Sequence, residues 1–132
     1  ANEKLYIASR TKSRIAIIDY NTLGLINEFT TVNKPLDMLI FDKTLYVLGA
    51  QTNEIQKINI DNDQVTGTIS LGTEGFSSGL TLIDDTCYAV STNIKNNQYT
   101  IIDLAKGKVL RTYKMNVPIK SVIITNKVGL FN

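Results

Sequence analysis

The stretch Leu45-Tyr46-Val47-Leu48 decides the fold, because it recurs together with a second block behind it, Ile55-Gln56-Lys57-Ile58-Asn59. The first block has counterparts at Leu5-Tyr6-Ile7-Ala8 and Cys87-Tyr88-Ala89-Val90. The second block has counterparts at Ile15-Ala16-Ile17-Ile18-Asp19 and Tyr99-Thr100-Ile101-Ile102-Asp103. The period is about 41 residues, and each block is a short run rich in the residues that favour strands. The chain is therefore a threefold repeat of short strands.

A fixed period of this length with only short strands is typical of β-propeller blades. Each blade should hold four strands, a to d from the inside outward, and the first blade begins at strand b. The predicted strands are Leu5–Ser9, Arg14–Asp19, Leu25–Thr31, Leu36–Phe41, Leu45–Gly49, Ile55–Ile60, Val65–Leu71, Leu80–Ile83, Cys87–Ser91, Tyr99–Leu104 and Val109–Met115. Ser121–Thr125 and Val128–Phe131 should begin a fourth blade. The prediction is an all-β, partial or oligomer-completed propeller: one segment over 1–132, with repeats at 4–35, 36–79, 80–120 and a partial one at 121–132.

The composition is that of a folded domain. The chain has 132 residues, of which 43% are hydrophobic and 20% charged, as in ordinary globular proteins. The sequence contains no apolar run near the ~18 residues of a transmembrane helix, and its first residues do not resemble a signal peptide. Cys87 is the single cysteine, so no disulfide can form within the chain, and we expect a buried, inert thiol inside a strand.

Charge is distributed unevenly along the chain. The net charge is +2, but both ends are basic and the middle is acidic. No acidic residue follows Asp103, whereas the same segment carries Lys106, Lys108, Arg111, Lys114, Lys120 and Lys127. Basic ends can bind nucleic acid or an anionic surface. We favour the simpler interpretation, in which lysines on edge strands prevent edge-to-edge pairing.

The residue types exclude most catalytic sites. The chain has no histidine, which removes the usual general base and the commonest metal ligand. Its glycines form no phosphate-binding pattern. Asp19, Asn59 and Asp103 occupy the same place in the repeat, which predicts a structural cap on the turn that follows, and Asp61-Asn62-Asp63 belongs to such a turn. We expect no catalytic residue, no metal site and no cofactor.

Binding residues are expected in the loops between strands b and c and between strands d and a, because these loops converge over the centre of a propeller. The candidates are Arg10, Lys12, Arg14, Gln51, Asn53, Phe76, Asn93, Lys95 and Asn97. Basic members could hold an anion, and the amides could bind a sugar or peptide. A small molecule or a glycan is therefore an expected class of ligand.

Lys4-Leu5-Tyr6-Ile7-Ala8-Ser9 followed by Ile15-Ala16-Ile17-Ile18-Asp19 resembles the YVTN-type β-propeller repeat of bacteria and archaea. Thr31-Val32-Asn33-Lys34-Pro35-Leu36 resembles the Val-Gly-x-x-Pro segment that opens the next inner strand in that family. Two departures are Asn59 in place of the aspartate and Glu74–Gly79 in place of the proline segment. The resemblance implies an exported protein, periplasmic, cell-surface or extracellular, that works as a scaffold or ligand-binding ring.

Three blades are too few to close a ring of four to eight. The partner is then either the missing blades of the same propeller or a second copy that completes a ring head to tail. We favour the first, because a head-to-tail dimer brings basic ends together and sets Val128–Phe131 in competition with Leu5–Ser9. The expected function is a non-catalytic binding or interaction module. The alternatives are part of a propeller enzyme, lactonase-like or cofactor-dependent, with its catalytic residues in absent blades, and a binder of nucleic acid or anionic surfaces.

Overall fold

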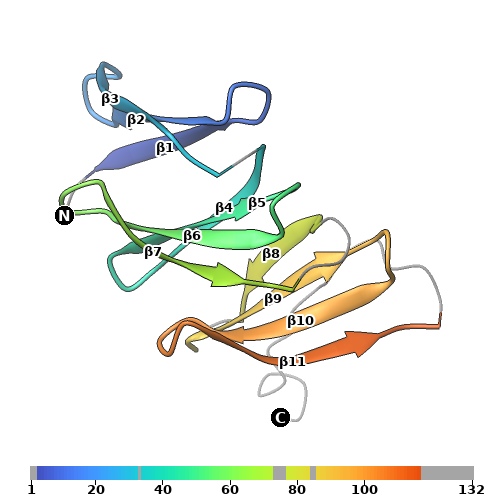
Figure 1. The fold of residues 1–132 in the computed structure, drawn as a ribbon. Helices are drawn as coiled ribbons and strands as arrows, with labels where there is room; N and C mark the ends of the chain where they lie inside the picture. The colour runs from blue at the N-terminus through green and yellow to red at the C-terminus, as the bar shows by residue number, and fades with distance from the viewer. Residues whose placement is uncertain (1–2, 33, 73–76, 84–85, 117–132) are drawn as a thin grey trace, which may run out of the picture.

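The computed structural model describes residues 3–32, 34–72, 77–83 and 86–116. These residues form three antiparallel sheets that lie side by side, from blue to orange in Figure 1. Blade 1 contains β1 (Lys4–Ser9), β2 (Arg14–Asp19) and β3 (Leu25–Thr30). Blade 2 contains β4 (Pro35–Phe41), β5 (Thr44–Gly49), β6 (Glu54–Asn59) and β7 (Gln64–Ser70). Blade 3 contains β8 (Gly79–Leu82), β9 (Tyr88–Asn93), β10 (Gln98–Asp103) and β11 (Lys108–Lys114).

This arrangement confirms the predicted fold class. Each sheet is a simple meander in which consecutive strands pair, as in a propeller blade. Blade 1 has three strands among the described residues and starts with β1, which takes the place of strand b. The predicted strands at Ser121–Thr125 and Val128–Phe131 lie outside the described residues.

The predicted equivalence of Tyr88 with Tyr46 is wrong. Tyr46 pairs with Lys57, two residues before Asn59. Tyr88 pairs with Asp103, which is the counterpart of Asn59 itself. Tyr88 therefore occupies the place of Thr44, and Val90 that of Tyr46. The cause is the connection between β8 and β9: six residues separate the paired Leu82 and Ala89, whereas four separate the paired Ile40 and Leu45 at the tight turn between β4 and β5. Cys87 consequently precedes β9 and is half-buried, with its thiol 3.7 Å from Asp103 Oδ1, not inside a strand as expected.

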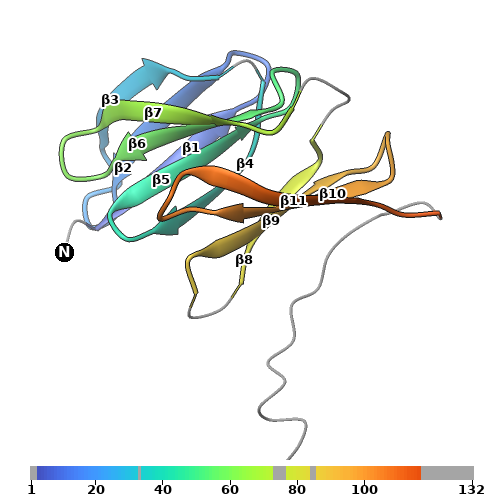
Figure 2. The same ribbon diagram turned by 60° about the horizontal axis from the view of Figure 1, so that its bottom comes forward.

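A β-bulge recurs at the same place in every blade. The register shifts between Ile17 and Ile18 in blade 1, and at the matching steps of β6 and β10. One extra residue enters the outermost strand each time: Ile26, Thr66 and Leu110. A bulge increases the local right-handed twist of the strand that carries it, and here it recurs at the same step of all three sheets. Figure 2 shows these sheets from a second direction.

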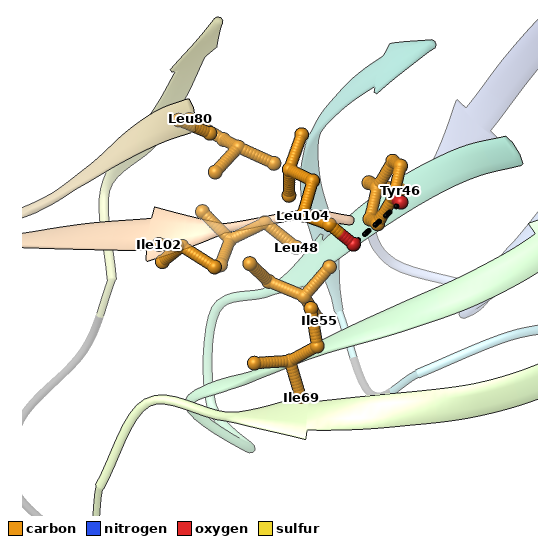
Figure 3. Packing of buried hydrophobic residues seen from close by; sticks show 8 residues of the cluster. Tyr46, Leu48, Ile55, Ile69, Leu80, Ile102 and Leu104 are labelled. Carbon is orange, nitrogen blue, oxygen red and sulfur yellow. Dashed lines mark hydrogen bonds between the residues drawn. The ribbon is translucent and has the colours of Figure 1, made fainter. Parts of the chain in front are cut away.

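Two apolar cores hold the blades together. Between blades 1 and 2 the buried residues are Ile15, Ile17, Val32, Leu45, Val47 and Ile58. Between blades 2 and 3 they are Tyr46, Leu48, Ile55, Ile69, Leu80, Ala89, Ile102 and Leu104 (Figure 3). Successive residues of a strand face opposite sides, so blade 2 supplies one face to the core with blade 1 and the other face to the core with blade 3.

The turn caps predicted from the sequence are confirmed. Asp19 Oδ1 accepts hydrogen bonds from the backbone N–H groups of Asn21 and Thr22, at 2.8 and 3.0 Å. Asn59 Oδ1 accepts one from Asp61 at 2.8 Å, and Asp103 Oδ1 accepts one from Lys106 at 3.0 Å. The bonds from the backbone of Thr22 and Asn21 hold the pKa of Asp19 below its usual value.

Candidate functional site

The loops that join strands b and c have one geometry in all three blades. Each has four residues, and its last residue, Ser13, Asn53 or Asn97, has a left-handed backbone with φ of 52°, 51° and 54°. The carbonyl of that residue accepts a hydrogen bond from the residue after strand d: Thr31 at 2.9 Å, Leu71 at 3.0 Å and Met115 at 2.7 Å. The three loops are thus fixed to the sheets and present their remaining residues at one end of the arc.

An open cavity of about 580 Å³ lies where these loops meet. Its lining combines residues of all three b–c loops with Leu36 near the start of β4 and with two serines just before β8. The lining residues are Arg10, Leu36, Ala50, Gln51, Ser77, Ser78, Ile94 and Lys95. The volume is within the range of small-molecule sites. The charged side chains among these lining residues, Arg10 and Lys95, are both basic, and they come from blades 1 and 3, on either side of blade 2.

Hydrogen bonds within the protein fix one wall of this rim cavity. The buried Ser77 Oγ donates to Asn53 Oδ1 at 2.6 Å, and Asn53 Nδ2 donates to the carbonyl of Gly72 at 3.0 Å. Ser78 Oγ lies 3.1 Å from both the carbonyl and the hydroxyl of Thr92. These bonds hold the two serines, which belong to the loop between strands d and a, against the b–c loop of blade 2 and against β9.

Three of the nine residues proposed from the sequence line the rim cavity: Arg10, Gln51 and Lys95. Lys12 is exposed on its loop. Arg14 is on β2, where its Nε donates to Glu28 at 2.5 Å.

The asparagines among the candidates stabilise the loops and do not line the cavity. Asn53 is buried in the network just described, and Asn93 is buried with its Oδ1 accepting from the backbone of Asn96 at 3.1 Å. Asn97 provides the left-handed turn, and Phe76 lies outside the described residues. The polar loops therefore divide into residues that shape the rim and residues that face the cavity.

Five lining residues were missed: Leu36, Ala50, Ser77, Ser78 and Ile94. The search for polar loop residues passed over the apolar ones among them. A usable signal was present in the repeat, because Ala50 and Ile94 both occupy the first position after strand b, next to Gln51 and Lys95. Position in the repeat would have found them where residue type did not.

The arrangement can hold a negatively charged group between Arg10 and Lys95 while an apolar part contacts Leu36, Ala50 and Ile94. In the described part of the chain, no three His, Cys, Asp or Glu side chains gather as metal ligands. The described residues also form no helix long and apolar enough to cross a membrane.

Comparison with solved structures agrees with this geometry. The chain is similar to Kuenenia stuttgartiensis hydrazine synthase, with a TM-score of 0.77, 19% identity and coverage of 86% of this chain and 33% of that one. It is similar to U3-55K, with a TM-score of 0.76, 16% identity and coverage of 88% of this chain and 37% of that one. It is also similar to the RRP9 WD40 repeats, with a TM-score of 0.75, 16% identity and coverage of 88% of this chain and 36% of that one.

The chain spans about a third of each of these structures. No family model and no curated protein sequence matches it, so the YVTN-type resemblance is supported at the level of the fold. WD40 repeats are propeller blades, and the chain has the fold of β-propeller blades.

Proposed function

We propose that this chain is a non-catalytic binding module whose ligand occupies the rim cavity. The observation that carries the proposal is that Arg10 of blade 1 and Lys95 of blade 3 line one cavity together with the apolar Leu36, Ala50 and Ile94, and that none of its described lining residues is acidic. A carboxylate recognised by two cations gains charge-assisted hydrogen bonds, and an apolar neighbour gains contact area. The ligand chemistry that fits is an acidic peptide with alternating apolar residues.

The fixed loop ends support a preformed binding site. The loop ends are anchored by the same backbone hydrogen bonds in each blade, so the site is formed before the ligand arrives. A preformed site loses less conformational entropy on binding.

The test is isothermal titration of the chain with a short peptide of alternating Glu and Leu. We expect Arg10→Gln and Lys95→Gln each to weaken binding by about 10-fold to 100-fold, the usual value of a hydrogen bond to a charged group. Lys12→Gln is the matched control, because it removes the same charge from the same loop as Arg10 but outside the cavity. Equal losses in Arg10→Gln and Lys12→Gln would show nonspecific attraction to a basic end and would overturn the proposed site.

A further inference from the structure

A second open cavity, of about 330 Å³, lies between blades 2 and 3 at the end of the sheets opposite to the rim cavity. Thr44, the first residue of β5, lines this turn cavity, whereas Ala50, just after the end of β5, lines the rim cavity. The volume is at the lower end of the range for small-molecule sites. The lining residues are Phe41, Asp42, Thr44, Tyr46, Lys57, Thr66, Leu104 and Ala105.

An ion pair occupies the corresponding place between blades 1 and 2. Lys4 Nζ lies 3.3 Å from the Asp63 carboxylate of the next blade, and the Tyr6 hydroxyl donates to the same carboxylate at 3.2 Å. The strand pairing makes Thr44 the counterpart of Lys4, and Tyr46 that of Tyr6. The junction between blades 2 and 3 therefore lacks the cation that strand b supplies to the first junction.

The carboxylate of the first junction is also missing from the second. Asp63 and Gly107 both have a left-handed backbone, with φ of 59° and 66°. Each comes four residues after the capping residue of its turn, Asn59 or Asp103, so Gly107 is the counterpart of Asp63. Blade 3 thus has no side chain where blade 2 has a carboxylate.

A cation reaches this place from strand c instead. Lys57 lines the turn cavity and is half-buried, and its Nζ lies 3.5 Å from the point that a Cβ atom would occupy at Gly107. Its counterpart in blade 1 is the fully buried Ile17. The ammonium group of Lys57 forms no hydrogen bond or ion pair within the part of the chain that the structure describes. The second junction thus keeps an ammonium group without the carboxylate that neutralises it at the first.

A glycine on the other side gives the stem of this lysine its space. Gly67 on β7 pairs with Lys57, and a Cβ atom there would lie 3.3 Å from Lys57 Cε. The corresponding residues in blades 1 and 3 are Asn27 and Arg111. Of the three blades, only the one with the lysine has a glycine at this position. The space around the lysine is therefore particular to this junction.

We propose that the turn cavity binds a small organic monocarboxylate, whose carboxylate takes beside Lys57 the place that Asp63 takes in the first junction. A carboxylate beside an ammonium group forms charge-assisted hydrogen bonds. The apolar part of the ligand would contact Phe41 and Ala105. Asp42 is the one acidic residue among these lining residues, and it repels a second negative charge. A monocarboxylate is therefore favoured over a phosphate.

The test is an NMR titration with phenylacetate, which joins one carboxylate to an apolar ring. The amide signals of Gly67 and Gly107, which flank the ammonium group, should shift and saturate. Lys57→Met keeps the length of the side chain without its charge and should weaken binding by about 10-fold or more. Gly107→Asp should weaken it similarly, because the new carboxylate would pair with Lys57 and take the place of the ligand.

Gly107→Asn is the matched control. Asparagine is as large as aspartate and tolerates the same left-handed backbone, but it carries no charge, so this variant should bind phenylacetate nearly as well as the wild type. Equal losses in Gly107→Asp and Gly107→Asn would overturn the proposal, because they would show that any side chain at this position blocks the cavity. Binding that Lys57→Met leaves unchanged, or shifts that do not saturate, would overturn it too. Inorganic phosphate that binds as tightly as phenylacetate would overturn the ligand class.

Discussion

The junction between blades 1 and 2 and the junction between blades 2 and 3 have the same backbone arrangement, but different polar side chains bond across them. Between blades 1 and 2, Lys4 Nζ donates to the carbonyl of Ile60 at 2.9 Å and forms an ion pair with Asp63. At the matching place between blades 2 and 3, the Tyr46 hydroxyl donates to the carbonyl of Leu104 at 3.3 Å, and the described residues form no ion pair there. The apolar centre of each junction is set by the repeat, whereas its polar ends are particular to that junction.

At the end of each junction near the b–c loops, the polar contacts also differ between the two junctions. Gln56 Oε1 accepts from Thr31 Oγ1 at 2.5 Å and from the N–H of Val32 at 3.2 Å, across blades 1 and 2. Across blades 2 and 3, Asp37 Oδ2 accepts from the N–H of Leu80 at 2.9 Å. One architecture therefore tolerates exchange of its polar contacts, as long as each buried donor keeps an acceptor.

The largest effect is expected from the apolar centre that both junctions share. Ile55 is fully buried between blades 2 and 3, and Ile55→Ala should lower the free energy of unfolding by about 2–5 kcal/mol. Val65→Ala in the same blade, at an exposed position, should change it by roughly 0.5 kcal/mol or less. Urea denaturation measures both. Similar losses in the two variants would show that the blade interface contributes little to stability.

The sequence predicts the buried apolar residues of the two junctions well, but it does not predict the polar contacts at the ends of the junctions. Ile15, Ile55 and Ile58 were placed in strands by alternation and repetition, and they are core residues in the structure. Gln56 was part of the repeated block too, but its counterparts are Ala16 and Thr100. A contact that occurs in one blade only produces no repeated pattern in the sequence. The partners of Gln56 therefore could not be identified from the repeat.

The error at β9 has a related physical cause. Strand side chains alternate with a period of two, and the longer connection before β9 moves the register by two residues. The pattern of inward and outward residues is therefore unchanged, and the shared tyrosine favoured the wrong alignment of Tyr88 with Tyr46. The hydrogen-bonded pairing with Asp103 resolves the register.

The residues that line the rim cavity could be predicted only in part from the sequence. Asparagine forms left-handed turns and also binds ligands, so Asn53 and Gln51 were equivalent candidates in the sequence. The structure buries Asn53 against Ser77 and places Gln51 at the cavity. The direction in which a loop side chain points depends on the strands that carry the loop, and a list of polar residues does not contain it.

A smaller loss of unfolding free energy is expected when a polar side chain near the b–c loops is replaced, and its size should differ between blades 2 and 3. Gln56→Met keeps the size of the side chain but removes the acceptor for the buried Val32 N–H. The expected loss in unfolding free energy is about 1–3 kcal/mol, the cost of an unsatisfied buried donor. Thr100→Val, at the counterpart position in blade 3, removes one hydroxyl contact of 3.3 Å with Thr112. It should cost about 1 kcal/mol or less, and a larger loss than for Gln56→Met would contradict the comparison.

The smallest effect concerns the turn end of the first junction and appears only at high pH. Burial, and after it the nearby Asp63 carboxylate, raise the pKa of Tyr6 from 10.0 to about 12. A raised pKa in the folded state means that the hydroxyl contributes its full stabilisation below pH 10, the unfolded value. That contribution is lost as the pH rises from 10 to about 12.

The wild type should therefore melt at progressively lower temperature across this range, and Tyr6→Phe should show a shallower decline. Tyr20→Phe, which removes an exposed hydroxyl, controls for the loss of a phenol in general. Melting curves by circular dichroism at intervals between pH 9 and pH 12 measure the three slopes. If Tyr6→Phe declines as steeply as the wild type, the contact between Tyr6 and Asp63 does not stabilise the junction. The two contacts of Lys4, with the Asp63 carboxylate and the Ile60 carbonyl, would then carry the polar contribution at this end of the junction.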